Sequence, residues 1–470
     1  MKLKKVEEAM NAFAQMYSTL SKWEVRSASL DNPSVVIVFL GFLKYISVYK
    51  NELKLDYPEK YSIDFMSLLY GQKVMSDELI EHITSVEQQL GFDRGILSSF
   101  IADLQLLNLE KELRELLDII NKIEIEDGEE GVIYEALTEY LAIQARNDMR
   151  FASEYTTDNR LAKLMGRIAD VRDEMSVYDF TAGYGTLLSE ATRGKNVNIY
   201  AQDIYRVATA VSIMLLVMSG QKNAVVGCDN TLTHPLIFDS NITKFDRVLS
   251  TPPLGLRVDN EMSRIKSGQQ AEAFEYGLAY KLSGDIVFVR HLLATLNEDG
   301  IGIMLVPMST LFKGGNEGKI REEMVRDNYI DSVIEMPSGI LPNTNVKTAL
   351  VVFKKNRNED DIYFVDLAKD SKEYTEKIGR VGVRFTEYGI DKVMKLIAEK
   401  KELPQVSVRI KCKTLMGQGV NLCPGSYLQV KLNELDDIQD IDKLIQENSN
   451  LFKKLEAVTT KLNGVIERLG

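Results

Sequence analysis

The sequence predicts an α/β protein built around a doubly wound, mainly parallel sheet of seven strands. Short apolar runs alternate with helical patterns from about residue 130 to 370, which is typical of a parallel sheet with helices on both faces. The first of these runs ends in Asp179 and breaks at Gly183 and Gly185 before a helical pattern resumes. Outside this region apolar residues recur at helical or heptad spacing, which indicates flanking helical segments.

We expect four parts along the chain. They are an all-helical N-terminal domain (1–128), an α/β domain (129–370), a helical or irregular extension (371–430) and a C-terminal coiled-coil-type helix (431–470). The acidic, glycine-bearing stretch 125–131 is the predicted hinge between the first two.

The first 125 residues carry a helical pattern and no recognisable chemistry, so we interpret them as a packing or docking domain. The pattern begins with Val6, Met10, Phe13, Ala14, Met16, Tyr17 and Leu20.

The predicted strands are short β-rich runs. They are 177–180, 197–201, 224–226, 247–250, 301–306, 330–335 and 348–354. After them come the run 362–366, a helical stretch (386–401) and a basic segment (408–413).

The last forty residues contain an apolar seam that alternates in steps of three and four. Its members are Ile441, Leu444, Asn448, Leu451, Leu455, Val458, Leu462, Val465 and Leu469. A heptad seam with one polar residue predicts a helix that packs on a partner helix. Packing against the core of the chain itself is the alternative.

Composition excludes several classes of protein. With three cysteines, three histidines and no Cys-x-x-Cys pair, a zinc site is not expected. No signal peptide or membrane span is recognisable, so we expect a cytoplasmic protein with reduced thiols. The net charge of −12 argues against a chain that coats nucleic acid unaided, but a basic cleft or partner can supply phosphate contacts.

Three carboxylates end the first three predicted strands. The turn after Asp179 resembles a cofactor loop, in which glycines let a ligand approach the backbone and helix N–H groups hold an anion. Asp203 follows at the interval, roughly 20 residues, at which an acid binds ribose hydroxyls. Asp229 is placed to accept a hydrogen bond from an adenine amine.

A further loop, Thr251-Pro-Pro-Leu254, ends the buried strand at 247–250. The two prolines remove two donors and stiffen the loop at the edge where such sheets bind substrates.

Several segments, in order, resemble the modification (M) subunit of type I restriction-modification systems, a family of adenine-N6 DNA methyltransferases. The matching segments are Glu154-Tyr-Thr-Thr157, Asp179-Phe-Thr-Ala-Gly-Tyr-Gly185, Gln202-Asp203, Gly227-Cys-Asp-Asn-Thr-Leu232, Thr251-Pro-Pro-Leu254, Gly284-Asp-Ile-Val-Phe288, Phe312-Lys-Gly-Gly-Asn-Glu-Gly-Lys-Ile-Arg321 and Val333-Ile-Glu-Met-Pro337.

The resemblance implies a Rossmann-like methyltransferase sheet and a site-specific, adenine-specific DNA methyltransferase that uses S-adenosylmethionine. It implies that the flipped base of double-stranded DNA is held by Thr251, Pro252, Pro253 and Leu254. The implied cofactor-binding residues are Tyr155, Thr156, Thr157, Asp179, Thr181, Gly183, Gly185, Asp203 and Asp229. The implied partners are a specificity (S) subunit, which reads the target and packs on the C-terminal helix, and a restriction (R) subunit.

Three positions depart from the family pattern. Thr251 stands where the family has Asn, Leu254 where it has Phe or Tyr, and Thr157 where it has Pro. An active M subunit and a catalytically impaired homologue with a structural or regulatory role therefore both remain open. An oxidoreductase using another adenine cofactor is less favoured, because a full G-x-G-x-x-G is missing and His234 reads as a loop residue.

Overall fold

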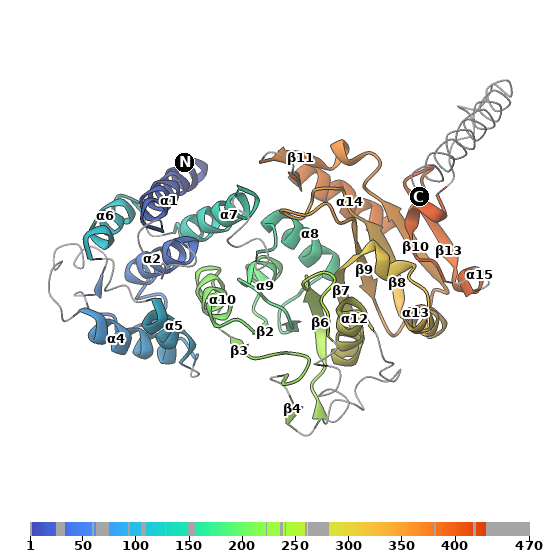
Figure 1. The fold of residues 1–470 in the computed structure, drawn as a ribbon, viewed down its shortest axis with the longest axis horizontal. Helices are drawn as coiled ribbons and strands as arrows, with labels where there is room; N and C mark the ends of the chain where they lie inside the picture. The colour runs from blue at the N-terminus through green and yellow to red at the C-terminus, as the bar shows by residue number, and fades with distance from the viewer. Residues whose placement is uncertain are drawn as a thin grey trace, which may run out of the picture.

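The computed structural model describes residues 2–428 except for internal gaps. The gaps are 25–32, 59–60, 63–74, 93–94, 105–109, 127, 148–155, 222, 236–237, 240, 259–260, 262–281, 380–381 and 417–419. The predicted seam at 441–469 lies outside the described residues. A helical region occupies one end of the molecule and a large twisted sheet the other (Figure 1).

The central sheet contains nine strands in the order β13-β10-β8-β9-β7-β6-β1-β2-β3. β9 pairs antiparallel with β7 and β8, β13 pairs antiparallel with β10, and the other pairs are parallel. The strands are β1 (Ser176–Asp179), β2 (Asn198–Asp203), β3 (Ala224–Cys228), β6 (Phe245–Ser250), β7 (Leu296–Pro307), β8 (Ile330–Glu335), β9 (Thr348–Phe353), β10 (Asp361–Asp366) and β13 (Ser407–Lys411).

All seven predicted strands are present, and β10 and β13 extend the sheet beyond them. The segment predicted only as basic is β13, in which exposed Arg409 and Lys411 alternate with half-buried Val408 and Ile410. An edge strand with one solvent-facing side has this period-two pattern, and its charges discourage further pairing. The predicted irregular extension also holds a hairpin of β11 (Thr375–Ile378) and β12 (Gly382–Phe385). A two-stranded sheet of β4 (Phe238–Asp239) and β5 (Asn241–Ile242) lies between β3 and β6 in sequence.

Alternate strand residues enter two separate apolar cores, which confirms the doubly wound arrangement. Val177 and Leu249 join the core of one face, whereas Tyr178 and Val248 join the other. The first core contains residues of α8 (Asn159–Ala169), α9 (Thr186–Thr192), α10 (Arg206–Met218) and α14 (Glu387–Glu399). The second contains residues of α12 (Gly284–Thr295), α13 (Asn316–Arg326) and α15 (Cys412–Met416).

The N-terminal helices share the first core with the sheet. They are α1 (Lys2–Glu24), α2 (Pro33–Val48), α4 (Met75–Gln89), α5 (Ile96–Leu104) and α6 (Glu110–Asn121), followed by α7 (Gly131–Asn147). α2 is buried from Pro33 to Ile46, and α10 contacts both α2 and α5. In the predicted hinge, the carboxylate of Glu129 lies 2.7 Å from the ammonium of Lys5 in α1. The predicted boundaries of the four parts remain predictions.

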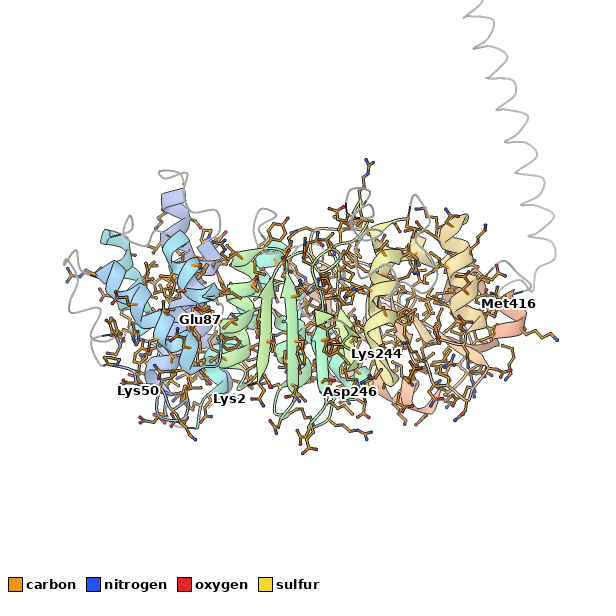
Figure 2. The ribbon with its side chains drawn as sticks, turned by 90° about the horizontal axis from the view of Figure 1, so that it is seen from below. Lys2, Lys50, Glu87, Lys244, Asp246 and Met416 are labelled. Atoms are coloured by element: carbon orange, nitrogen blue, oxygen red, sulfur yellow. The ribbon has the colours of Figure 1, made fainter. Side chains whose placement is uncertain are left out.

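Polar contacts fix the register of the central strands at the end of the sheet where β6 begins. Figure 2 marks this end with Lys244 and Asp246. The carboxylate of Asp246 accepts hydrogen bonds from the backbone N–H (2.9 Å) and hydroxyl (2.8 Å) of Ser176 and from Asn297 Nδ2 (2.9 Å). β1, β6 and β7 are therefore aligned, so that the opposite ends of β1 and β6 lie level.

Helices α8 and α9 are in close contact, and α9 begins directly after Gly185 of the glycine turn. A Cβ at Gly166 would lie 2.6 Å from the Cα of Ala191, a backbone atom that cannot rotate away. We expect G166A to destabilise the protein by on the order of 1–3 kcal/mol. The steric cost should exceed the gain of about 1 kcal/mol that alanine brings through its helix propensity. Urea unfolding followed by circular dichroism measures the difference.

The matched control is G425A, because a Cβ at Gly425 meets no atom within 4 Å. Its unfolding midpoint should equal that of the unaltered protein. A G166A midpoint at or above that of G425A would contradict the prediction.

Candidate functional site

Parallel pairing brings three strand ends to one edge of the sheet. β1 pairs with β2 on one side and β6 on the other, so Asp179, Asp203 and Ser250 end neighbouring strands. The backbone N–H of Asp229, just after β3, donates to the carbonyl of Asp203 over 3.0 Å. The three carboxylates predicted from the sequence therefore follow one edge, where parallel α/β sheets bind ligands.

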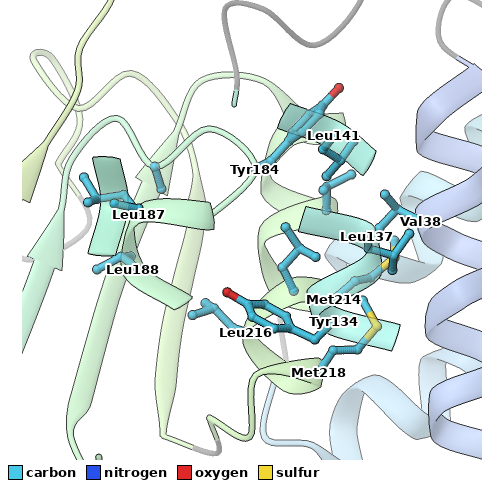
Figure 3. Close-up of a cluster of buried hydrophobic side chains, with 14 of the residues drawn as sticks. Val38, Tyr134, Leu137, Leu141, Tyr184, Leu187, Leu188, Met214, Leu216 and Met218 are labelled. Carbon is cyan, nitrogen blue, oxygen red and sulfur yellow. The ribbon is translucent and has the colours of Figure 1, made fainter. Parts of the chain in front are cut away.

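The turn after β1 requires its two glycines. Gly183 and Gly185 have φ values of 54° and 77°, which residues other than glycine rarely adopt. A Cβ at Gly185 would also lie 2.4 Å from Ser212 Oγ and 3.0 Å from Ser212 Cα in α10. Between the glycines, buried Tyr184 joins the cluster that includes Leu141 of α7 (Figure 3). The turn is thus held against the helices that pack on it.

The carboxylate of Asp203 is hydrogen-bonded to the glycine turn. Its carboxylate accepts hydrogen bonds from the backbone N–H of Gly183 (2.9 Å) and of Tyr205 (3.0 Å). Burial raises the pKa of Asp203 above its usual range, and these backbone donors oppose the shift. The next two side chains, Ile204 and Tyr205, are each 55% exposed, so apolar surface borders the carboxylate.

Asp179 is the most deeply buried acid of the edge. One carboxylate oxygen accepts hydrogen bonds from the backbone N–H of Thr181 (3.0 Å) and the hydroxyl of Ser250 (2.8 Å). The other, Oδ2, is buried and has no hydrogen-bond partner among the described residues. Burial, assisted by the charge of Asp203, raises the pKa of Asp179 to about 7. An unpaired buried acceptor of this kind suits a cationic or hydrogen-bonding ligand.

Asp229 lies on an exposed turn that is anchored from within. Its carboxylate accepts a hydrogen bond from the N–H of Asn230 over 2.7 Å and lies 3.5 Å from Nδ1 of His234. The buried Gln202 amide donates to the carbonyls of Asp229 (3.1 Å) and His234 (2.8 Å). His234 is therefore a turn residue, as the sequence predicts.

The loop after β6 approaches the segment that precedes α8. The hydroxyls of Thr251 and Thr157 are 2.7 Å apart, within hydrogen-bond distance. Pro252 is buried, Pro253 is exposed and Leu254 is half-buried. Of the neighbouring predicted residues, Thr156 is buried with no partner for its hydroxyl among the described residues, and Tyr155 lies outside them.

Two acids near helix N-termini bind this loop and the residue that precedes α12. Asp285 of α12 accepts a hydrogen bond from the N–H of Gly255 over 2.9 Å. Glu317 of α13 accepts from the N–H of Ser283 (3.0 Å) and the ammonium of Lys313 (2.8 Å). Beside Lys313, the aromatic ring of Phe312 is 55% exposed.

Sequence reasoning assigned no role to three of these residues. Ser250 bridges Asp179 and Thr181, its hydroxyl lying 2.5 Å from Thr181 Oγ1. Asp285 and Glu317 fall within recognised motifs, but their partners lie 30 and 34 residues away in sequence. A hydroxyl at the last position of a buried strand was the signal for Ser250, whereas the helix contacts carried none.

The part of the chain that the structure describes shows neither a metal-binding cluster nor a membrane-spanning helix. No group of three or more His, Cys, Asp or Glu side chains there could hold a metal ion. None of its helices is both long and apolar enough to cross a membrane.

Comparison with known proteins identifies relatives of this fold and site. The model of the N-6 DNA Methylase family matches residues 129–436. The methylase subunit of the type I restriction enzyme MpnII of Mycoplasma pneumoniae is 26% identical over 384 residues, 76% of this chain and 68% of that protein. The methylase subunit of MjaVII of Methanocaldococcus jannaschii is 23% identical over 375 residues, 76% of this chain and 62% of its own length.

A solved structure shows the same fold. The methyltransferase subunit of a type I restriction-modification system from Streptococcus thermophilus has a TM-score of 0.72 at 20% identity, covering 90% of this chain and 100% of that one. The α/β fold with a large, mainly parallel sheet is confirmed. Because the family model spans well over half of the 470 residues, the chain belongs to the N-6 DNA methylase family, within which it resembles the methylase subunits of type I restriction enzymes.

Proposed function

We propose that this chain is the modification subunit of a type I restriction-modification system and transfers a methyl group from S-adenosylmethionine to N6 of adenine in DNA. The observation that supports this most is the hydrogen bond between the ends of β1 and β6. Ser250, which directly precedes Thr251, donates a hydrogen bond to Asp179, which directly precedes the glycine turn. A cofactor on the turn and a base on the Thr251 loop would then be neighbours, as transfer requires.

The residues at the glycine turn fit S-adenosylmethionine. Asp203 would accept hydrogen bonds from the ribose hydroxyls, and the exposed apolar side chain of Ile204 would cover the adenine ring. Oδ2 of Asp179, which has no partner in the described part of the chain, would accept from the cofactor's ammonium group. Thr156, whose buried hydroxyl has no partner among the described residues, and the exposed Asp229 would also contact the cofactor. When bound, the cofactor supplies a methyl group on a positively charged sulfur.

The Thr251 loop would orient the acceptor nitrogen. The hydroxyl of Thr251 and the carbonyl of Pro252 would each accept a hydrogen bond from the N6 amine, leaving its lone pair directed toward the methyl group. Leu254 would cover the base with apolar surface, and the amine would lose one proton to solvent as the N–C bond forms. An adenine held in this way cannot remain stacked in the duplex, so it would have to be flipped out of the DNA.

The proposed partners follow from charge and from the C-terminal pattern. A chain with a net charge of −12 needs another source of phosphate contacts, which a specificity subunit would provide. The heptad seam from Ile441 to Leu469 is the segment proposed to pack on that subunit. A restriction subunit would join the same complex, in the cytoplasm.

The role of Asp203 can be tested by cofactor binding. We expect D203A to weaken S-adenosylmethionine binding about 100-fold or more, because charged hydrogen bonds to two hydroxyls are lost, each worth roughly 1.5–3 kcal/mol. Isothermal titration calorimetry on the purified chain gives the Kd, and circular dichroism checks the fold. D299A, at an exposed acid that binds Asn356, is the matched control. Equal affinities for the two variants would remove the assignment of Asp203.

The pKa of Asp179 predicts how cofactor binding depends on pH. With a pKa of about 7, the free carboxyl is largely protonated at pH 5.5–6, and contact with an ammonium group favours its ionised form. Binding should therefore release a proton, and affinity should rise from pH 5.5 to 7 by up to about tenfold per pH unit. Calorimetry in two buffers of different ionisation enthalpy counts the protons released.

D179N keeps an oxygen that can accept from Thr181 and Ser250 but has no titrating group. Its affinity should be lower and nearly independent of pH over the same range. A pH dependence as steep as that of the unaltered chain would assign the titration to another group.

The proposed reaction is tested by co-expressing the chain with its specificity subunit and mapping N6-methyladenine in DNA base by base. We expect methylation at one defined sequence. G183D is the control. Gly183 has positive φ and its N–H binds Asp203, so an Asp side chain there would strain the turn and place a second carboxylate beside that of Asp203. A complex that assembles and binds S-adenosylmethionine but leaves DNA unmethylated would refute the proposed activity.

A further inference from the structure

We infer that Thr157 is a positioning residue for the methyl acceptor, because its hydroxyl fixes the rotamer and the proton of Thr251. The inference rests on the proposed methyl transfer and deepens it. The sequence pattern places Thr157 with the cofactor-binding residues, whereas in the structure its hydroxyl lies 2.7 Å from that of Thr251. Two hydroxyls from positions 94 residues apart therefore form one unit at the base side of the site.

Thr157 directly precedes a residue that is held by several polar contacts. The next residue, Asp158, caps α8 by accepting a hydrogen bond from the N–H of Arg160 over 3.0 Å. Asp158 also forms a buried ion pair at 3.0 Å with Arg146, whose guanidinium donates to the carbonyls of Ile340 and Val383. The backbone at Thr157 is therefore tied to α7, α8 and β12.

Thr251 is equally constrained on its own side. Ser250 is bound to Asp179, and the proline at 252 restricts the residue before it to extended backbone. The side chain of Thr251 can still rotate about χ1, and its hydroxyl hydrogen about the Cβ–Oγ1 bond. A hydrogen bond to a fixed partner removes both freedoms.

The direction of this hydrogen bond decides whether the site works. A hydroxyl has one proton to donate and lone pairs to accept. If Thr251 donates to Thr157, its lone pairs are left to accept from the N6 amine. If Thr251 is left with an unpaired proton, that proton can bind the lone pair of the amine, and the lone pair is then not available to attack the methyl carbon. In the direction that the reaction requires, Thr251 donates and Thr157 accepts, which keeps the proton of Thr251 away from the nucleophile.

The pairing also connects two departures from the family pattern noted in the sequence. Asn at 251 would present a planar amide, whose oxygen is an acceptor in any rotamer, whereas a threonine hydroxyl needs a neighbour to set its proton. A hydroxyl at 157 supplies that neighbour. The two positions thus differ from the pattern as a matched pair.

The test is a double-mutant cycle on the complex with its specificity subunit, using T157V, T251V, T157V/T251V and the conservative T157S. Single-turnover methylation gives the rate, calorimetry gives the Kd for S-adenosylmethionine, and 2-aminopurine at the target position reports base flipping by fluorescence. T375V is the matched control, because Thr375 lies in the β11 hairpin and its hydroxyl binds the carbonyl of Ser371.

We expect T157V to slow methylation about tenfold or more, consistent with loss of an oriented hydrogen bond. Cofactor affinity and flipping should stay within about twofold, T157S should recover most of the rate, and T375V should not differ from the unaltered complex. The double variant should be no slower than T251V alone, because both changes remove the same unit.

Three outcomes overturn the inference while leaving the proposed function intact. They are an unchanged rate for T157V, losses that multiply in the double variant, and a loss of cofactor affinity that accounts for the slower rate. Failure of the unaltered complex both to flip and to methylate DNA would instead refute the proposed function, and the inference with it.

Discussion

The parallel pairing of β1 with β6 is the constraint on which the site depends. Asp246 fixes the two strands where β6 begins, and the hydrogen bond from Ser250 to Asp179 joins them at the other end. A shift of one residue in this register would turn Asp179 from the buried position at the strand end to the opposite face. The glycine turn and the Thr251 loop would then no longer share an edge. One strand pair therefore sets the distance between the two halves of the proposed reaction.

The same pair explains why a buried acid is tolerated. Burying an ionised carboxylate without full pairing is unfavourable, and Asp179 responds with a pKa near 7 rather than with a second donor. Its Oδ2 has no hydrogen-bond partner among the residues that the structure describes. In the proposed function, a donor from the cofactor would satisfy this oxygen, and its burial would then contribute to the free energy of binding. Tyr184 and α10 pack against the turn that follows β1.

The sequence was sufficient to predict the sheet and the strand-end acids, because both follow from local patterns. Apolar runs of strand length, a Gly-x-Gly turn and acids at strand ends are visible within a few residues of one another. β13 was missed because alternating Arg409 and Lys411 read as a charged segment, and its pairing with β10 is a tertiary fact. The hydrogen bonds that Asp285 and Glu317 accept were missed for the same reason, because the sequence at a helix start does not indicate which distant N–H an acid there binds.

Thr251 shows the limit of judging a site one position at a time. Compared with the family pattern alone, a shorter side chain at this position reads as loss of an acceptor, and Thr157 reads as an unrelated change. The structure places the two hydroxyls 2.7 Å apart, so the environment of Thr251 is not the one that an Asn would occupy with a proline opposite. Whether an acceptor is adequate depends on its orientation as well as its identity, and orientation here is supplied from a segment 94 residues away. A pair of departures that contact each other is therefore better understood as an alternative solution to one geometric requirement than as two separate defects.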